Sequence, residues 1–268
     1  MNSFELYALL EIPAVVVAKL DPMGTVLPME ELEPYLDGMM AGETAAATYE
    51  ELKAFLQADE GCFKMLWCQL ECARRCHERY RACGIPEPVF VDTMKCFQRF
   101  LHECEKRTGE MYFDRGWWTY RQISMRLFRV GQLEYELCSA GAEKTVSVHI
   151  PSDAVFTPAN VDESLEQAKH FIERYFPDYR DAKRVCSSWL LSPQLGELLP
   201  EQSNIRGFQR RFQILEEYPD DRDFLEWLFQ ASKDAEVSDL PEATRLQRAA
   251  KKLLLSGKTI GAAYGIMI

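Results

Sequence analysis

The spacing of apolar residues changes near residue 111, and this change limits the architectures that the chain can form. Between residues 66 and 80, apolar side chains recur at the three- and four-residue steps of an amphipathic helix. From Ser124 to Cys138 and again from Thr145 to Ile150, apolar and polar residues alternate as in a strand with one buried face. The sequence therefore predicts an α+β protein with α/β layers, in which a helical domain of residues 1–110 precedes a sheet domain of residues 111–268.

Stop signals bound the helices of the first part. A glycine followed by a proline, at Gly84 and Pro86, is expected to end the helix that contains residues 66–80. Asp92 is expected to cap the next helix, and Gly109 to close it. Two shorter helices are expected before these, at Glu30–Leu36 and Thr48–Gln57.

The second part is expected to begin with a β-hairpin. The turn Ser139-Ala140-Gly141 joins the two alternating segments, and Pro151 ends the second strand. In that strand Val146, Val148 and Ile150 share one face, and Thr145, Ser147 and His149 share the other. The elements expected next are a helix around residues 160–175, a strand at Arg184–Leu191, a helix at Gln194–Leu199, a strand at Ile205–Leu215, helices at Phe224–Phe229 and Thr244–Leu255, and a strand at Ala262–Ile268. Helices between strands require at least one crossover connection.

The formal charge of −11 comes almost wholly from residues 1–60. That segment holds two lysines against twelve acidic residues, which leaves 29 basic and 30 acidic residues for the rest of the chain. Without a dense stripe of Lys and Arg, neither nucleic acid nor an anionic membrane surface is an expected partner. No apolar run reaches the roughly 18–20 residues of a membrane span, and no secretory signal is expected, so a cytoplasmic location is predicted.

Seven of the nine cysteines fall in the first part of the chain. Cys68, Cys72 and Cys76 recur every four residues beside His77 and would line one helix face. Metal binding is one hypothesis for this row. Structural zinc normally uses paired ligands in loops, however, whereas free cysteine behaves as a small buried apolar residue. Packing in the core is therefore the favoured interpretation, and no metal is expected.

Two residues of the hairpin are candidates for a general base. His149 lies on the polar face of the second strand just before a loop, where an imidazole that titrates near neutrality can meet a substrate. Glu134 on the first strand is the second candidate. A structural hydrogen bond for His149, and an exposed hairpin face for Glu134, are the simpler interpretations of the same residues.

Polar residues farther along the chain offer weaker candidates. Packing is favoured for Cys186, because the sequence locates no base partner for a thiol nucleophile, and Ser187 would point to the opposite face. Ser203 and Asn204 either shape a turn or hydrogen-bond a carbonyl or an amide of a bound molecule. The motifs GxGxxG and GxxxxGK are absent, so neither Rossmann redox chemistry nor nucleoside triphosphate chemistry is expected.

A succession of segments in the second part of the chain carries a family resemblance. They are FRVGQLEYEL (128–137), VHIPSD (148–153), SLEQAKHFIERYFP (164–177), CSSWLLSPQLGELLP (186–200), SNIRGFQRRFQI (203–214) and LQRAAKKLLLSG (246–257). In this order they resemble a bacterial family of acyltransferase-domain proteins whose C-terminal half is GNAT-like. The preceding GIPEPVFVDTM (84–94) and DRGWWTYRQ (114–122) are similar to the helical N-terminal domain and the junction of that family. The resemblance covers residues 60–268.

The resemblance implies a GNAT-type sheet that holds acyl-coenzyme A, acetyl-CoA or a longer acyl-CoA, between two splayed strands. These strands would be Val146–Ile150 and Arg184–Leu190, and the pyrophosphate would lie over a helix that begins near Asp162. The residues expected to contact the acyl-CoA are Ile150, Ser152, Ser187 and Trp189, and those expected to contact the acceptor are Ser203 and Asn204.

The leading hypothesis is an N-acyltransferase that transfers an acyl group from acyl-CoA to an amine of a small molecule or peptide. His149 or Glu134 would remove the ammonium proton, and backbone amides around Ile150 would stabilise the oxyanion. The alternative is a GNAT-like binding or scaffold protein without activity. It is suggested by the segment PSDAVFTPANVDES (151–164), which stands where GNAT enzymes have a Gln/Arg-x-x-Gly-x-Gly/Ala loop.

Overall fold

The computed structural model describes residues 1–268 and divides the chain into two compact units. The first unit is Met1–Val130 and the second is Gly131–Ile268. The division falls after the strand β1 (Leu127–Val130), whereas the change in apolar spacing lies near residue 111. The boundary between the units lies later than residue 111 because helix α9 (Gly116–Ile123) packs on helix α6 (Phe63–Ala82) of the first unit. In this contact Gln69 Nε2 donates to the Gly116 carbonyl at 2.8 Å.

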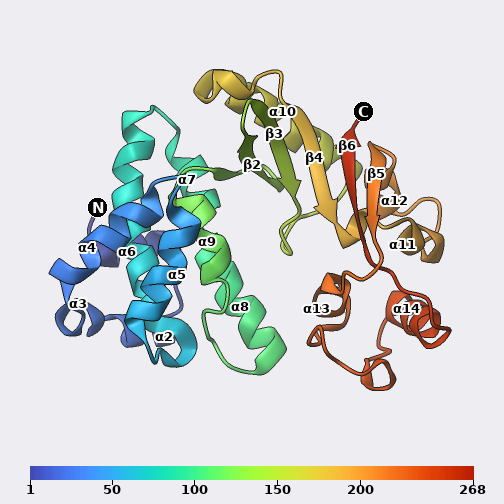
Figure 1. Ribbon diagram of the computed structural model, residues 1–268, viewed down its shortest axis with the longest axis horizontal. Helices are drawn as coiled ribbons and strands as arrows, with labels where there is room; N and C mark the ends of the chain where they lie inside the picture. Colours follow the sequence, from blue (N-terminus) through green and yellow to red (C-terminus); the bar gives the residue numbers. More distant parts are fainter. The chain divides into compact units, whose positions relative to one another are not determined.

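The first unit is helical up to β1, as predicted (Figure 1). Its other helices are α1 (Ser3–Leu9), α2 (Ala14–Leu20), α3 (Met23–Val26), α4 (Met29–Met40), α5 (Ala45–Leu56), α7 (Glu87–Met94) and α8 (Cys96–Thr108), with a 3₁₀ turn at Glu60–Cys62. The predicted stops are confirmed, since Gly84 follows the end of α6 with φ +68° and Gly109 caps α8 with φ +81°. The prediction for Asp92 is wrong, because this residue lies inside α7. That helix begins at Glu87, since proline at position 88 is tolerated in a first turn.

Helix α6 buries its row of cysteines. Cys68, Cys72 and Cys76 are each fully buried, which confirms the packing interpretation. Burial raises the pKa of Cys68 and Cys76 to about 12 and that of Cys72 well above its ordinary value, so all three remain neutral thiols. No group of three or more His, Cys, Asp or Glu side chains is arranged to hold a metal ion.

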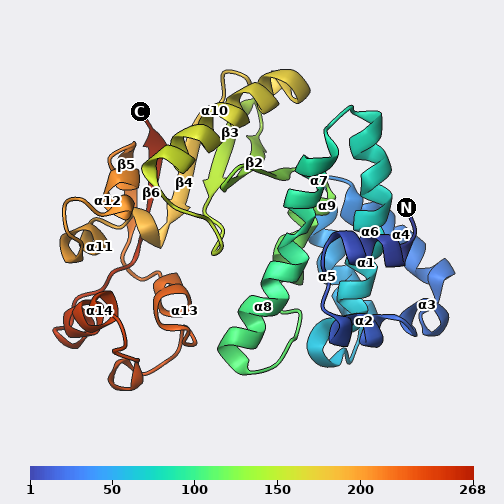
Figure 2. The same ribbon diagram turned by 180° about the vertical axis from the view of Figure 1, so that it is seen from behind.

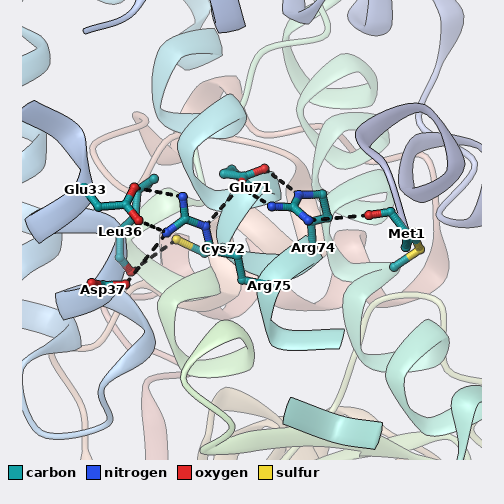
Figure 3. A network of polar contacts seen from close by, with 8 residues as sticks. All are labelled: Met1, Glu33, Leu36, Asp37, Glu71, Cys72, Arg74 and Arg75. Carbon is teal, nitrogen blue, oxygen red and sulfur yellow. Dashed lines mark hydrogen bonds and ion pairs between the residues drawn. The ribbon is translucent and has the colours of Figure 1, made fainter. Parts of the chain in front are cut away.

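A network of charges ties α6 to α4 next to Cys72, whose thiol lies 3.5 Å from the Leu36 carbonyl of α4 (Figure 3). Glu71 accepts hydrogen bonds from Arg74 and Arg75, and the guanidinium of Arg75 forks onto the carboxylate of Glu33 in α4. A bidentate pair of this kind has a defined geometry, so it restricts how the two helices pack.

The second unit is a mixed sheet with helices. Its strands are β2 (Leu133–Ala140), β3 (Glu143–His149), β4 (Lys183–Ser188), β5 (Phe212–Tyr218) and β6 (Ala262–Met267), in the order β2-β3-β4-β6-β5. Its helices are α10 (Pro158–Tyr175), α11 (Pro193–Leu198), α12 (Asn204–Gln209), α13 (Asp223–Phe229) and α14 (Arg245–Leu255), with 3₁₀ turns at Pro177–Tyr179, Trp189–Leu191 and Val237–Asp239. Only β3 and β4 are parallel, and α10 is the crossover between them. The predicted hairpin is β2–β3.

Helix α10 lies along one face of the sheet (Figure 2). On that face Val146 and Val148 are each 1% exposed, and the Tyr135 hydroxyl lies 3.0 Å from Ser164 Oγ of α10. A separate apolar cluster joins α11, α13 and α14, with Phe224, Leu225 and Phe229 at its centre. Figure 1 shows α13 and α14 beyond the ends of the strands rather than on a face of the sheet.

Two predictions for this unit are wrong. The first half of the predicted strand Ile205–Leu215 is helix α12, and the strand begins only at Phe212. Helix α12 is held by Gln209, whose Nε2 donates to the carbonyls of Leu190 and Ser192, both at 2.9 Å. The start of α10, at Pro158, is also four residues earlier than the start near Asp162 that the resemblance implied, because proline is preorganised for the first helical position.

Candidate functional site

The β2–β3 hairpin gathers polar side chains on the sheet face opposite α10. In the antiparallel register Glu134 pairs with His149, and Glu136 pairs with Ser147. Directly paired residues project from the same face, so the two carboxylates and the imidazole are neighbours. Both carboxylates are nearly buried, with Glu134 3% and Glu136 7% exposed. The simpler interpretation of Glu134, an exposed hairpin face, is therefore wrong.

His149 makes a defined contact within this group. Its Nε2 lies 3.1 Å from Glu136 Oε2, across the strands and two residue pairs along from its direct partner. An ionised carboxylate only accepts, so with Glu136 ionised the ring would donate through Nε2, and a neutral ring would then carry its lone pair on Nδ1. The side chain of His149 is 22% exposed, so the imidazole is held but still accessible.

The two parallel strands stop pairing before they end. The pairs are Thr145 with Lys183, Val146 with Arg184, and Ser147 with Val185, yet β3 continues to His149 and β4 to Ser188. Over its last residues β4 pairs with β6 alone. The backbone of β3 after Ser147 therefore lacks a strand partner on the β4 side, at the end where His149 lies.

Two predicted residues follow this parting, one on each strand. Ile150 comes directly after β3, and Ser187 lies near the end of β4, where it is exposed. Since Ser147 pairs with Val185, Ser187 projects from the same face as His149. Cys186 points the other way and is fully buried; burial raises its pKa to about 12, so it is a neutral core thiol.

The other predicted residues lie in separate elements. Ser152 is exposed in the loop after β3. Trp189 begins the 3₁₀ turn after β4 and packs against the apolar cluster of α11, α13 and α14. Ser203 precedes α12, where its side chain makes no capping hydrogen bond, and Asn204 is the exposed first residue of that helix.

The amino end of α10 differs from a glycine-rich phosphate loop. Thr157 caps the helix and accepts from the Asn160 amide at 3.3 Å, while Pro158 has no N–H to offer. Asp162 lies beyond the first turn and forms an ion pair with Arg211. That ion pair lowers the pKa of Asp162, mainly through the hydrogen bond from Arg211. The carboxylate of Asp162, which was expected at the helix end, thus lies inside the helix, where Arg211 balances its charge.

Glu136 is the member of the group that sequence reasoning did not select. Its position two residues after Glu134 puts it on the same strand face, and the imidazole contacts it on the diagonal although the register pairs His149 with Glu134. The sequence pattern alone treats the two glutamates alike.

These features of the sheet define the GNAT class of acyltransferase folds. In this class two central parallel strands of a mixed sheet part toward their carboxyl ends, and the crossover helix lies between them in sequence. Known domain families agree with this assignment. The GNAT-like C-terminal domain family matches residues 127–267, and the N-acyltransferase N-terminal domain family matches residues 1–125. The chain belongs to the acyltransferase family with a GNAT-like C-terminal domain, as the resemblance implied.

Solved structures share the fold over the whole chain. A crystal structure of an acyltransferase in complex with decanoyl-CoA and teicoplanin is 23% identical, with a TM-score of 0.77 over 99% of this chain and 87% of the other. An acyltransferase mutant in complex with octanoyl-CoA is 22% identical, with the same TM-score and coverage. An acyltransferase with CoA and 10C-teicoplanin is 20% identical, with a TM-score of 0.72 over 100% and 99% of the two chains.

No curated protein matches the sequence. None of the helices has both the length and the apolar character needed to cross a bilayer.

Proposed function

We propose that the protein is an N-acyltransferase that moves an acyl group from acyl-CoA to an amine of a small molecule or peptide. The observation that carries this proposal is the parting of β3 and β4, with the imidazole of His149 beside it. Strands that no longer pair leave backbone N–H and C=O groups that a ligand with amides of its own can satisfy. The pantetheine arm of CoA is such a ligand.

The residues present fit an acyl-CoA donor at this place. The backbone around Ile150 would pair with the pantetheine and donate to the thioester oxygen, while Ser187 faces the same space from β4. Ser152 lies in the loop toward α10, and Trp189 continues from β4. The similar structures contain CoA, octanoyl-CoA or decanoyl-CoA, which supports a donor with an acyl chain of that size.

The chemistry required of the chain is proton removal and oxyanion stabilisation. The acceptor ammonium loses a proton to a base, and the freed amine attacks the thioester carbonyl, forming a C–N bond and a tetrahedral oxyanion. Collapse of this intermediate breaks the C–S bond and releases the CoA thiolate, while the nitrogen gives up its second proton to form the amide.

His149 is the better of the two candidate bases. Its ring is partly exposed at the strand end, whereas the carboxylate of Glu134 is 3% exposed. A base has to come within hydrogen-bonding distance of the ammonium, and a buried carboxylate has less access to it. We assign Glu134 to the surroundings of the imidazole, directly opposite it in the hairpin register.

The acceptor is proposed as a small molecule or peptide amine, with Ser203 and Asn204 among its contacts. Two of the similar structures contain teicoplanin or 10C-teicoplanin, which supports an acceptor larger than a simple metabolite. All nine cysteines of this chain are free, which supports a location in the reducing cytoplasm.

Calorimetric titration with acetyl-, octanoyl- and decanoyl-CoA tests the donor half of the proposal. We expect binding to at least one of them, and release of CoA thiol when teicoplanin or another amine is added, with the acylated amine identified by mass spectrometry. A folded protein that gives no heat with the whole series would refute the proposal. That result would support the binding or scaffold alternative, which the absent glycine-rich loop and the proline at the start of α10 favour.

The variant His149→Gln tests the assignment of the base. It should keep the affinity for acyl-CoA and lose about 10²–10⁴-fold in kcat, the usual contribution of a general base. A variant of Glu134 that loses activity while His149→Gln stays active would reverse the assignment.

A further inference from the structure

Two glutamates flank His149 on the hairpin, and the ring of His149 contacts Glu136. Glu134 is the direct cross-strand partner, but the imidazole Nε2 lies 3.1 Å from Glu136 Oε2 on the diagonal. Glu136 is only 7% exposed as a residue, and a buried polar side chain of this kind is retained when it is hydrogen-bonded. The contact therefore restrains both the rotamer and the tautomer of the imidazole.

We infer that Glu136 is the positioning residue of the acyl transfer, acting through His149 by holding its Nε2–H and leaving Nδ1 as the nitrogen that takes the acceptor's proton. This inference rests on the proposed function. Glu136 itself touches neither the amine nor the thioester. The proton moves from the acceptor ammonium to His149 Nδ1, and the ionised carboxylate stabilises the imidazolium cation that results.

The rigid hairpin gives this arrangement its precision. Glu136 and His149 lie on adjacent strands that pair from Glu134–His149 to Ala140–Glu143 without a break, so the ladder fixes the separation of their Cα atoms. Sites built on regular strands hold side chains more precisely than sites built on loops. The imidazole is thus oriented before the substrates bind.

A second glutamate–histidine pair in the same unit supplies a matched control. On α10, His170 Nε2 lies 3.1 Å from Glu166 Oε1, the same distance as in the hairpin, but both side chains are exposed. An exposed pair contributes little, because water competes for both groups. The substitution Glu166→Gln therefore makes the same chemical change next to a histidine with no role in the site.

A double-mutant cycle tests the kinetic part of the inference. Glu136→Gln should lower kcat at least about 10-fold and leave the KM and the Kd for octanoyl-CoA nearly unchanged, because the lost interaction acts on proton transfer. In a His149→Gln background the same substitution should have no further effect on kcat. Glu166→Gln should leave kcat unchanged. Equal losses in both backgrounds would show that Glu136 acts independently of His149 and would overturn the inference.

Nitrogen-15 NMR of the histidine rings tests the contact without any assay of activity. The chain has four histidines, and the signals of His149 are identified by their loss in His149→Gln. We expect an Nε2-bound proton protected from solvent exchange in the unmodified protein, and loss of that protection in Glu136→Ala, which removes both acceptor oxygens. A ring protonated on Nδ1, or an unprotected Nε2–H, would overturn the inference even if the protein is an active acyltransferase. If Glu136→Ala does not fold, Glu136→Asp keeps the charge at a shorter reach and should show the same loss of protection.

Discussion

Replacing Glu71 by glutamine should weaken the first unit in a pH-dependent way. In Figure 3 the carboxylate of Glu71 receives three charge-assisted hydrogen bonds, from Arg74 Nε at 2.8 Å, Arg74 Nη2 at 2.7 Å and Arg75 Nε at 2.9 Å. The amide of glutamine keeps one acceptor oxygen and turns an NH₂ group toward the remaining guanidinium donor. At least one bond is lost, Arg74 loses its ion-pair partner, and Arg75 keeps only the carboxylates of Glu33 and Asp37.

The expected size of the loss follows from the exposure of the arginines. A hydrogen bond to a charged group contributes about 1.5–3 kcal/mol, and a fully buried pair that loses one partner costs more. The side chains of Arg74 and Arg75 are 29% and 22% exposed, so water partly replaces the carboxylate. We expect the free energy of unfolding of the first unit to fall by about 2 kcal/mol at pH 7.

Acidification should remove the difference in unfolding free energy between the unmodified protein and Glu71→Gln. Burial by itself would raise the pKa of Glu71, but the hydrogen bonds and charges of Arg74 and Arg75 outweigh it, so the pKa is lowered from 4.5 in the folded protein. A lowered pKa gives stability that is complete above the unfolded value and is lost as the pH falls through the folded value. The network therefore stabilises the protein fully at pH 7 and progressively less below about pH 4.5.

Hydrogen exchange of α6 peptides in a urea series measures this stability separately from that of the second unit. The control is Glu78→Gln, an exposed glutamate of the same helix with the same change in charge. The reasoning is refuted if Glu71→Gln and Glu78→Gln are equally stable at pH 7, or if the loss caused by Glu71→Gln is as large at pH 3.5 as at pH 7.

Three further outcomes are expected from single substitutions. Ser164→Ala should lower the free energy of unfolding of the second unit by about 1–3 kcal/mol in urea titrations, because it leaves the buried Tyr135 hydroxyl and a strand amide without their partner; an unchanged midpoint would contradict this. Cys83 is the exposed cysteine and should react first with a thiol reagent in the native protein, so Cys83→Ser should remove the fast phase; a fast phase that survives would place reactivity elsewhere. Gly261→Ala should lower the melting temperature, because the residue has φ +66° and an added Cβ would lie 2.6 Å from a backbone oxygen; an unchanged melting temperature would show that this turn adapts.

Local signals account for the elements that were predicted correctly. The strands of the hairpin follow from their two-residue alternation, and Gly84 and Gly109 end their helices because each adopts a positive φ that other residues rarely adopt. These signals act over a few neighbouring residues, so the sequence displays them directly.

The elements that were predicted wrongly depend on distant partners. Residues 204–209 have a spacing of aromatic and charged side chains that suits a strand as well as a helix. The helix forms where Gln209 reaches two carbonyls that lie 17 and 19 residues earlier in the chain. The interpretation of Glu134 as exposed was wrong for a related reason, since an alternating strand shows which residues share a face but not which face is covered.

The sequence by itself indicated the family, the change from helices to a sheet, the hairpin with its two faces, and two candidate bases on the face opposite α10. Only the tertiary structure decided that β3 and β4 stop pairing before they end, and that the ring of His149 contacts Glu136 on the diagonal. Apolar spacing is a property of one strand, so it can be read along the chain. Register and the parting of two strands are properties of a pair, set by hydrogen bonds between segments more than thirty residues apart in the case of β3 and β4, and no local pattern records them.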